Sequence, residues 1–451
     1  MFRSIGVLGL ARSGRAAAEL ALAKGVSVYA ADAADHEELR RGAQALGALG
    51  ADVELGHISV DKLLQVDAIV VSPGIPPKAP PFDDPRLAKV KRISEIEFAY
   101  RFLTSRIIAI TGTNGKSTTT ALVGHLLNTG GISAVVAGNI GNALSNVALR
   151  DVQPMWAVVE VSSFQLSDID RFAPTIGAVT NLAPDHLDRY ESVEAYYADK
   201  QKLFKHSSMD TIWVLNGDDP EVMALAGDAY GRRLIFKLSG PLQEGEHGAY
   251  LSQDGDLMLK VDLLRARLVN QHELKLIGAH NHANALCASL VAIGTGVPLP
   301  ALRDGLRSFE GLPHRLQVVS RAGDITWIND SKATNVTSTS VALQSITQPT
   351  ILLLGGRHKG EPYSELLPYL RHVKTVIAYG EAAPAIVHDL QGRAPVEHVP
   401  GSFDAVVARA AELAVPGDVV LLSPACSSFD MFRNYEERGA AFARLALQVG
   451  S

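Results

Sequence analysis

The chain has 451 residues, too many for one ordinary hydrophobic core, and at roughly 150 residues per domain it predicts about three domains. Hydrophobic residues make up 47% and charged residues 20%, with 42 Lys plus Arg against 48 Asp plus Glu and a formal net charge of −6. This composition is typical of a globular protein. It excludes a global basic field that would recruit nucleic acid, so any anionic ligand must be bound by local positive groups.

The cysteines and the apolar runs favour a soluble cytoplasmic protein. Cys287 and Cys426 lie far apart, match no metal or redox spacing, and are expected as small core residues in a reducing compartment. The apolar run at residues 5–10 is too short for a signal peptide, and no run approaches the roughly eighteen apolar residues of a membrane span. We expect a monomer that binds no nucleic acid and has no membrane span.

The N-terminal segment has the strand, loop, helix, strand and acid order of a Rossmann-like βαβ unit. The expected elements are a strand at residues 4–10, a loop at 9–14, an alanine-rich helix at 15–24 and a strand at 26–30 followed by Asp32. Between Gly9 and Gly14 the middle glycine of the dinucleotide fingerprint is missing. A nucleoside diphosphate sugar touching Arg12 and Ser13 therefore suits the loop better than a dinucleotide, and a purely structural turn is the alternative.

A further strand at residues 68–71 runs into Ser-Pro-Gly-Ile-Pro-Pro. This sequence places a rigid loop at the carboxyl edge of the same sheet, where open α/β sheets bind ligands. A proline-rich stretch at 76–85 and a short connecting helix at 94–100 follow. The first domain is therefore predicted at residues 1–95.

The stretch at residues 106–120 carries the strongest functional signal. An isoleucine-rich strand breaks at Gly112, and after Lys116 the apolar residues take helical spacing. The loop Thr-Gly-Thr-Asn-Gly-Lys-Ser-Thr predicts a phosphate cradle, in which backbone N–H groups and the helix N-terminus attract phosphates, Lys116 reaches the terminal ones and Ser117 holds Mg²⁺. The general pattern expects a glycine where Ile110 stands, so Gly112 must make the turn.

The rest of the second domain, predicted at residues 96–310, alternates strands with helices. This alternation predicts a largely parallel sheet covered on both faces. Short apolar runs at 240–274, around an Asp-Gly turn, indicate an antiparallel edge, and a helix at 281–293 closes the domain. The expected strands are 133–136, 157–161, 176–180 and 211–215.

The third domain, predicted at residues 311–451, has strands expected at 350–354, 374–378 and 419–422 and a last helix near 436–449. The predicted fold class is therefore α/β with three domains. The first is Rossmann-like, the central one is an ATPase domain of the phosphate-loop type with a mostly parallel sheet, and the last is again Rossmann-like.

Acidic side chains follow two strands of the central domain. Glu160 ends an apolar strand, where a second Mg²⁺ ligand beside a phosphate loop is needed, and a buried acid paired with a lysine is the alternative. Asp185, His186 and Asp188 follow the next strand, where they could serve a metal or orient a base. Taken alone, this second cluster is more often a charged loop.

Together these motifs resemble the Mur ligases, the ATP-dependent amino-acid-adding enzymes of peptidoglycan synthesis. The resemblance runs from Gly9 to Gly439 and rests on residues 111–118, 160–165, 185–190, 278–284 and 314–315. Residues 329–335, 354–359 and 422–439 are similar to the members that add D-glutamate to UDP-N-acetylmuramoyl-L-alanine.

The resemblance implies a reaction. The γ-phosphate of ATP passes to the terminal carboxylate of the substrate, the incoming amine attacks the acyl phosphate, and phosphate leaves as the amide forms. A carboxylate is a poor electrophile until its oxygen becomes a good leaving group, and phosphoryl transfer between anions needs cations around both. ATP and two Mg²⁺ ions are implied.

The resemblance also implies roles for individual residues. Catalytic roles are implied for Lys116, Glu160, His186 and Lys200, and metal binding for Ser117, Glu160, His186 and Lys200. ATP binding is implied for Gly112, Thr113, Asn114, Gly115, Lys116, Ser117, Thr118, Asn281, Asn284, Arg315, Asp330 and Lys332. Contacts with the UDP substrate are implied for Arg12, Ser13, Asp32, Gly74, Asn139 and His186, and contacts with the amino acid for Thr334, Lys359, Ser428 and Phe429.

Some of these assignments have competitors. In the family the lysine matching Lys200 is carbamylated by CO₂, which turns a cation into an anion able to serve the second metal. From the residues alone, a helix-face lysine next to Asp199 is a solvated charge, and Lys202 competes for the role. Arg357, in the same loop as Lys359, can share the task of that lysine, and Asn281 also suits a helix N-cap.

Three other functions stay open at this point. The first is a ligase of the same superfamily that uses another amino acid or acts on folate. The second is a nicotinamide-dependent dehydrogenase built on the N-terminal unit, and the third is a phosphate-loop switch protein that hydrolyses nucleotide. The residues do not distinguish D- from L-glutamate, because the two carry the same groups in different placement.

Overall fold

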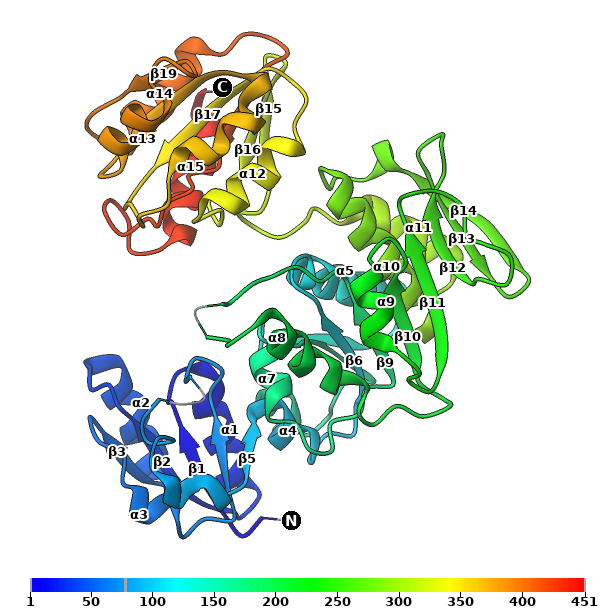
Figure 1. Ribbon diagram of the computed structural model, residues 1–451, viewed down its shortest axis with the longest axis vertical. Helices are drawn as coiled ribbons and strands as arrows, with labels where there is room; N and C mark the ends of the chain where they lie inside the picture. The colour runs from blue at the N-terminus through cyan, green and yellow to red at the C-terminus, as the bar shows by residue number, and fades with distance from the viewer. Residues whose placement is uncertain (1, 77–78, 188, 450–451) are drawn as a thin grey trace. The chain divides into compact units, whose positions relative to one another are not determined.

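The computed structural model describes residues 2–76, 79–187 and 189–449 and contains three β-sheets in succession along the chain (Figure 1). The chain divides into two compact units. The first unit, Met1–Glu273 with Ala283–Arg307, contains the first two sheets, and the second unit, Leu274–His282 with Ser308–Ser451, contains the third. The predicted α/β class with three domains is confirmed. Of the residues described, none belongs to a helix long and apolar enough to cross a bilayer.

The first sheet has five parallel strands in the order β3-β2-β1-β4-β5. The order reverses between β1 and β4, which opens a ligand crevice at the carboxyl ends of these strands. The strands are β1 (Ser4–Leu8), β2 (Ser27–Asp32), β3 (Asp52–Leu55), β4 (Ala68–Val71) and β5 (Arg92–Ser94). The helices are α1 (Arg12–Ala23), α2 (Glu37–Ala48), α3 (Val60–Leu63) and the 3-10 helix η1 (Pro85–Lys89).

Helix α1 begins at Arg12, so the predicted start at residue 15 was wrong. Gly9, with φ +83°, makes the turn alone, and the chain is helical soon after it. A Cβ at Gly14 would collide with the carbonyl oxygen of Gly9, so that glycine permits close packing of α1 on the strand end instead of extending the loop. Arg12 and Ser13 therefore lie in the first helical turn.

The second sheet has nine strands in the order β14-β13-β12-β11-β10-β9-β6-β8-β7. The pairs β12–β13 and β13–β14 are antiparallel and the others parallel, which confirms the predicted antiparallel edge. The strands are β6 (Arg106–Thr111), β7 (Ala134–Gly138), β8 (Trp156–Glu160), β9 (Ile176–Val179), β10 (Ile212–Asn216), β11 (Arg232–Lys237), β12 (Gly248–Leu251), β13 (Asp256–Val261) and β14 (Leu264–Asn270).

Helices accompany this sheet along the chain. They are α4 (Glu95–Tyr100), α5 (Lys116–Thr129), α6 (Leu144–Ala148), α7 (Ser163–Ser167), α8 (Val193–Gln201), α9 (Pro220–Ala226) and the 3-10 helices η2 (Lys202–Phe204) and η3 (Gln271–Glu273). Two further helices span residues at which the chain passes between the units, α10 (Ala279–Thr295) and α11 (Leu299–Ser308).

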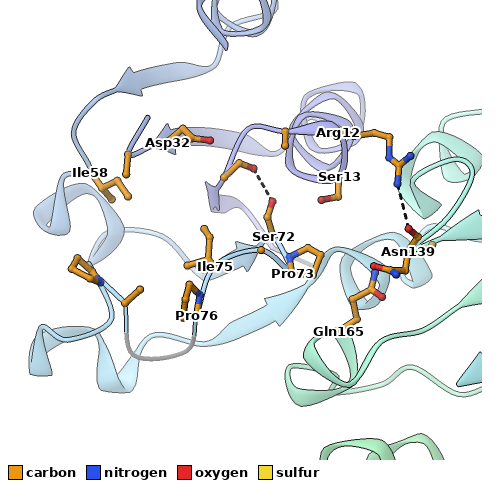
Figure 2. A pocket seen from close by; sticks show the side chains of 17 residues that line it. Arg12, Ser13, Asp32, Ile58, Ser72, Pro73, Ile75, Pro76, Asn139 and Gln165 are labelled. Atoms are coloured by element: carbon orange, nitrogen blue, oxygen red, sulfur yellow. Dashed lines mark hydrogen bonds between the residues drawn. The ribbon is translucent and has the colours of Figure 1, made fainter. Parts of the chain in front are cut away.

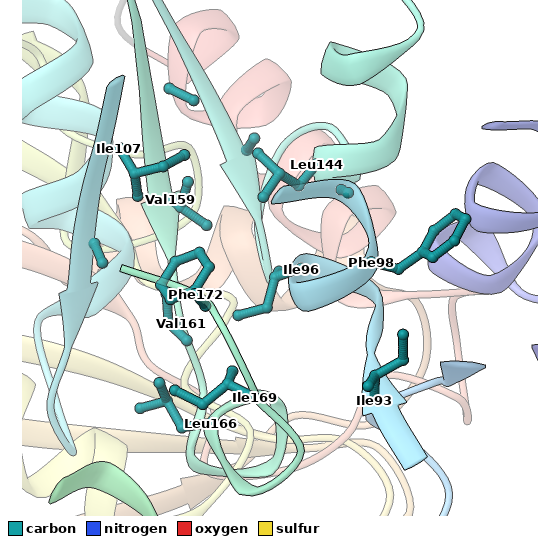
Figure 3. Packing of buried hydrophobic residues seen from close by; sticks show 14 of the residues in the cluster. Ile93, Ile96, Phe98, Ile107, Leu144, Val159, Val161, Leu166, Ile169 and Phe172 are labelled. Atoms are coloured by element: carbon teal, nitrogen blue, oxygen red, sulfur yellow. The ribbon is translucent and has the colours of Figure 1, made fainter. Parts of the chain in front are cut away.

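Helix α4 joins the first two sheets through one hydrophobic core. Figure 3 shows Ile96 of α4 among buried residues of the second sheet, and the same cluster includes Ile5 of β1. The buried carboxylate of Glu97 accepts N–H donors from residues 170–172 at 2.8–2.9 Å, which fixes α4 to the loop after α7. Ser94, predicted to be helical, instead ends β5. Shared burial of this kind explains why both sheets belong to one compact unit.

The third sheet, yellow to red in Figure 1, has six strands in the order β15-β16-β20-β17-β18-β19. Only β15–β16 is antiparallel among the described pairs. The strands are β15 (Gln317–Ala322), β16 (Ile325–Asn329), β17 (Thr350–Gly355), β18 (Val373–Tyr379), β19 (Val396–His398) and β20 (Val419–Leu422). The helices are α12 (Val336–Gln344), α13 (Ala383–Leu390), α14 (Phe403–Leu413), α15 (Tyr435–Val449) and the 3-10 helix η4 (Tyr363–His372).

Both faces of the third sheet are buried. Along β17, Leu352 and Leu354 belong to one hydrophobic cluster, while Ile351 and Leu353 belong to another on the opposite face. This period of two is expected for a strand covered on both sides, and it accounts for the continuous apolar run from which β17 was predicted.

Candidate functional site

The predicted phosphate loop connects β6 to α5, and its two glycines make the turn. Gly115 is the N-cap of α5 with φ +79°, and a Cβ there would collide with Oδ1 of Asn284. Gly112 has φ +142°, and a Cβ there would collide with Oγ1 of Thr180. Both positions therefore require glycine, and Gly112 supplies the turn where Ile110 replaces the glycine of the general pattern.

The segment after β9 holds this loop in place. The backbone N–H of Thr113 donates to the carbonyl of Asn181 at 2.8 Å, and that of Asn114 donates to Oδ1 of Asn181 at 2.9 Å. Oγ1 of Thr180 donates to the carbonyl of Asn114 at 2.6 Å. Since the first N–H groups of a helix have no acceptor within it, the fixed loop presents the positive end of α5 to an anion.

Two lysines meet at one carbonyl of this loop. Nζ of Lys116 donates to the carbonyl oxygens of Gly112 at 3.1 Å and Thr113 at 2.8 Å. Nζ of Lys200, on α8, donates to the same Gly112 oxygen at 2.8 Å. Lys200 is only 1% exposed, and its burial, followed by the charge of Lys116, lowers its pKa to about 7. Lys200 is therefore not the solvated surface charge that its sequence context suggests.

Lys202, the competing lysine, has a different environment. Its side chain is 41% exposed and forms an ion pair with Asp199 at 2.7 Å. Its Nζ also donates to the carbonyl of Ser167 at 2.8 Å. The geometry therefore favours Lys200 over Lys202 as the lysine of the phosphate loop.

Glu160 ends β8 with one buried carboxylate oxygen that has no hydrogen-bond partner in the described structure. Its other oxygen accepts from Nδ2 of Asn139 at 2.7 Å. A buried carboxylate oxygen without a partner is costly, so this atom suits a bound cation. The donor set is consistent with Mg²⁺, which prefers hard oxygen ligands and often takes only one or two from carboxylates.

His186 lies on the loop after β9 in a left-handed conformation, with φ +55°. Its ring is 5.0 Å from that of Phe164 and 6.1 Å from that of Tyr196. Nζ of Lys200 lies 4.6 Å from the same Tyr196 ring, so His186 and Lys200 flank one aromatic side chain. Asp188 lies outside the described residues. Within them, no three His, Cys, Asp or Glu side chains come together as a metal site.

A pocket of about 610 Å³ opens at the carboxyl end of the first sheet (Figure 2). Its volume lies in the usual range for ligand sites. Nη2 of Arg12 donates to the carbonyl of Asn139 at 3.4 Å, and Asp32 accepts from the N–H groups of Leu10 at 2.7 Å and Ala34 at 2.9 Å. Five of the six predicted contacts with the UDP substrate line it, namely Arg12, Ser13, Asp32, Gly74 and Asn139. The sixth, His186, is not among the described lining residues.

Ser72 and Ile75 also line the pocket and belong to the loop that was predicted at this ligand-binding edge, whereas Ile58 and Gln165 were not predicted as site residues. Oγ of Ser72 donates to the carbonyl of Gly9 at 2.8 Å, which ties the loop after β4 to the turn after β1. Gln165 forms a capping box with Ser162 at the start of α7. The Ser-x-x-Gln spacing signals such a cap, but its proximity to the pocket depends on how two sheets pack.

The second unit gathers its predicted residues at the carboxyl ends of adjacent strands. Asp330, Lys332 and Thr334 follow β16, Lys359 follows β17, and Ser428 and Phe429 follow β20, and these three strands are neighbours in the sheet. The carboxyl edge of an open α/β sheet is where such folds bind ligands. Arg315 lies on the segment that leads into β15. Arg357, expected to share the task of Lys359, forms an ion pair with Glu381 at 3.2 Å.

The two asparagines of α10 fall in different units. Asn284 belongs to the first unit, where its Oδ1 accepts from Oγ1 of Thr119 at 3.1 Å and lies against Gly115. Asn281 belongs to the second unit, and its Nδ2 donates to the carbonyl of Ile277 at 2.7 Å. The prediction of Asn281 as an N-cap was wrong, because α10 already begins at Ala279.

Asp330 is a buried carboxyl in the second unit. It accepts from Oγ of Ser423 at 2.8 Å and from the N–H of Leu316 at 3.2 Å, yet its burial raises its pKa to about 7. A raised carboxyl pKa means that the folded state binds the proton more tightly than the unfolded state. The free energy of unfolding therefore falls as pH rises from about 4 to about 7, and the loss is complete above that range.

We expect Asp330→Asn to remove this pH dependence, because asparagine has no proton to lose. Relative to the variant, the wild type should lose about 2–3 kcal/mol of stability between pH 5 and pH 8. Urea unfolding of both proteins at the two pH values measures the difference, and other titrating groups cancel in the comparison. Parallel stability curves for the two proteins would contradict the assignment.

The fold and these sites define an α/β enzyme of the nucleotide-binding class, in which a phosphate loop and a pocket of ligand size share one unit. Three family models match successive parts of the chain. They are Mur ligase MurD-like, N-terminal domain at residues 3–94, Mur ligase middle domain at 110–292, and Mur ligase, glutamate ligase domain at 314–426. The chain belongs to the Mur ligase family. Membership removes the dehydrogenase and the switch protein from the alternatives.

Curated relatives match the chain over nearly its whole length. The protein from Anaeromyxobacter dehalogenans is 43% identical over 98% of this chain and 97% of its own, and that from Myxococcus xanthus is 41% identical over 97% of each. The protein from Salinibacter ruber is 40% identical over 97% of this chain and 96% of its own. All three are named UDP-N-acetylmuramoylalanine--D-glutamate ligase.

Solved structures share the fold at lower identity. UDP-N-acetylmuramate-alanine ligase MurC from Thermotoga maritima has a TM-score of 0.58 at 18% identity and covers 99% of both chains. A pseudomurein peptide ligase type C from Methanothermus fervidus has a TM-score of 0.56 at 19% identity, over 93% of this chain and 96% of its own. At such identities the likeness concerns the fold alone.

Proposed function

We propose that the protein joins D-glutamate to UDP-N-acetylmuramoyl-L-alanine by an amide bond, with hydrolysis of ATP to ADP and phosphate, as a step of peptidoglycan precursor synthesis in the cytoplasm. The observation that carries the proposal is the near full-length similarity, up to 43% identity, to relatives that bear the name of this activity. The phosphate loop and the pocket of about 610 Å³ in the same unit support it. The monomeric state stays a prediction.

The pocket suits the UDP substrate. Arg12, in the first turn of α1, offers a guanidinium and helix N–H groups to a diphosphate, and the fixed carboxylate of Asp32 offers acceptors to hydroxyl or ring N–H donors. Gly74, which follows β4, and Asn139, which follows β7, also line the pocket. On this proposal the alanyl carboxylate of the substrate extends from the pocket toward Glu160, whose side chain accepts a hydrogen bond from Nδ2 of Asn139.

The phosphate loop suits ATP. Lys116, the N-terminus of α5 and the hydroxyl of Ser117 would hold the terminal phosphates, and Ser117 with the unpartnered oxygen of Glu160 would hold Mg²⁺. The metal would neutralise phosphate oxygens and so favour attack by another anion. Nζ of Lys116 already donates to two loop carbonyls. When ATP binds, Nζ would exchange one of these carbonyl acceptors for a charged phosphate oxygen, which is a stronger acceptor.

The reaction has two steps. In the first, a carboxylate oxygen of the alanyl group bonds to the γ-phosphorus and the bond to the ADP oxygen breaks, with Lys116 stabilising the charge that develops. In the second, the amine of D-glutamate bonds to the acyl carbon, loses a proton, and the acyl carbon–oxygen bond to phosphate breaks. Thr334, Lys359, Ser428 and Phe429 are proposed to hold the amino acid, and Asn281, Asn284, Arg315, Asp330 and Lys332 to contact ATP.

Lys200 suits a carbamate for a reason visible in its surroundings. Two ammonium groups, on Lys116 and Lys200, share the carbonyl of Gly112, and burial lowers the pKa of Lys200 to about 7. A lowered pKa leaves the neutral amine that adds to CO₂ with loss of a proton. The resulting anion would attract Lys116 where the ammonium repels it. With His186, it would provide ligands for a second Mg²⁺.

The expected result with UDP-N-acetylmuramoyl-L-alanine, ATP and Mg²⁺ is an amide product with D-glutamate, with phosphate release that depends on both substrates. L-Glutamate should react at least about 100-fold more slowly, since its groups meet the same site in the wrong placement. Phosphate release and product mass are measured together, with amino acid omitted as the control. Product with a different amino acid alone, or with a folate acceptor, would overturn the substrate assignment and leave the ligase class intact.

A further inference from the structure

Arg438, on the first turn of α15, is a buried arginine to which none of the steps above gives a role. It is only 1% exposed, and its guanidinium donates five hydrogen bonds. Nε donates to Oγ of Ser331 at 2.9 Å and Nη2 to the carbonyl of Ser331 at 2.8 Å. Nη1 and Nη2 both donate to the carbonyl of Cys426 at 3.1 Å, and Nη1 donates to the carbonyl of Gly355 at 3.5 Å.

The three acceptor residues lie at the carboxyl ends of three neighbouring strands. Ser331 follows β16, Gly355 ends β17 and Cys426 follows β20. Each of them leads within a few residues into a segment proposed to bind ATP or the amino acid. One side chain therefore ties together the starts of all three segments, which are far apart in sequence.

The loops pass so close to the guanidinium that little room remains for other arrangements. A Cβ on Gly356 would collide with the carbonyl of Ser427 and lie 3.1 Å from Nη1 of Arg438. The N–H of Arg357 donates to the same Ser427 carbonyl at 2.8 Å, which joins two of the segments directly. Nδ2 of Asn329 donates to the carbonyl of Gly439 at 2.9 Å and so fixes α15 to the sheet. The backbone that carries Arg438 is therefore held in place.

A contribution to the stability of the folded state does not by itself explain why an arginine is buried here. Among the described residues Arg438 forms no ion pair, and its acceptors are four neutral oxygens. A buried charge without a counter-charge is costly, and well-packed apolar side chains often stabilise a core at least as well. The planar guanidinium, however, offers five donors in fixed directions, a property that an apolar residue or a lysine lacks.

We propose that Arg438 is a positioning residue whose guanidinium sets the mutual placement of the three segments that bind the amino acid and ATP. The inference rests on the proposed function, because it assigns these segments to D-glutamate. Arg438 touches neither substrate and acts through Ser331, Gly355 and Cys426. Its fixed donor geometry, and not its charge alone, is the property required.

The test compares Arg438→Lys, which keeps the charge, with Arg438→Gln, which removes it, in the full-length protein. We expect both to raise KM for D-glutamate at least about tenfold, equivalent to about 1.4 kcal/mol. KM for the UDP substrate should stay within about twofold, because its pocket lies in the first unit. Arg409→Gln is the matched control. It removes a partly exposed arginine of the same unit that pairs with Glu397 and Glu412, and it should leave each KM unchanged.

Each other outcome has a defined meaning. Wild-type KM in Arg438→Lys with a defect only in Arg438→Gln would show that charge suffices and overturn the inference, as would unchanged or equally raised KM values. If both variants fail to fold, Ser331→Ala removes the Nε acceptor together with the hydrogen bond that Oγ of Ser331 donates to the carbonyl of Tyr435 at 2.8 Å. This variant should raise KM for D-glutamate about threefold, and the absence of a selective rise would overturn the inference. A wild type that uses another amino acid refutes the proposed function, and the same KM comparison is then made with that amino acid.

Discussion

Lys116→Ala is expected to lower turnover by at least about 1,000-fold, the scale of loss seen when a preorganised charge at a transferring phosphoryl group is removed. Nζ of Lys116 lies at the N-terminus of α5, donating to the carbonyls of Gly112 and Thr113. No other ammonium in the described phosphate loop replaces it, since Lys200 comes from α8 and is buried behind the same carbonyl. Phosphate release at saturating substrates measures the effect.

Lys205→Ala is the matched control, because Lys205 is an exposed lysine that follows η2 in the same unit. It should retain turnover within about twofold, as expected for an exposed side chain away from the site. Retention of activity within a few-fold in Lys116→Ala would remove the lysine from the mechanism. A rise in KM for ATP with unchanged kcat would mean that the lysine binds the ground state and the transition state equally.

The phosphate loop could be predicted from sequence because its determinants are contiguous. Gly112 and Gly115 provide two positive φ angles, and Lys116 and Ser117 follow at once, so a single stretch specifies the turn, the charge and the hydroxyl. The same holds for Asp32, which a strand end delivers to the sheet edge by a general rule. Contiguous motifs of this kind can be recognised without a structure.

Residues whose role depends on burial could not be predicted in the same way. Lys200 and Tyr196, four residues apart, are the buried positions of α8, whereas Asp199 between them pairs with Lys202 on the outer side. The sequence presents the two lysines as equals, and only packing against the phosphate loop separates them. Gln165 was missed for a similar reason. It follows β8 of the second sheet, and it lines the pocket of the first sheet only because the two sheets share one hydrophobic core.

The inferred role of Arg438 depends on contacts that no sequence pattern reveals. Its acceptors are main-chain carbonyls and one hydroxyl, and main-chain carbonyls exist at every residue. The boundary errors have a simpler cause. Helix α1 begins at Arg12, β5 ends at Ser94 and α10 begins at Ala279. At each boundary the turn is very short, and sequence propensity does not locate such boundaries to the residue.

Lys200→Ala is expected to lose at least about 100-fold of turnover and to regain part of it with acetate, on the premise that Lys200 acts as a carbamate that binds metal. Removal of the side chain leaves space beside Tyr196 and the carbonyl of Gly112, which a short carboxylate can enter. Acetate then places two oxygens next to Lys116, as the carbamate would. Turnover as a function of acetate concentration measures the rescue.

Lys202→Ala provides the control that the sequence itself suggests, because it removes a partly exposed lysine two positions away that pairs with Asp199. A partly exposed pair of this kind contributes only about 1 kcal/mol, so turnover should stay within a few-fold and acetate should have no effect. Loss in Lys200→Ala without rescue would indicate that the amine itself is needed and would contradict the carbamate. Loss in Lys202→Ala instead would transfer the role to the exposed lysine, against the burial and the shared carbonyl that distinguish Lys200.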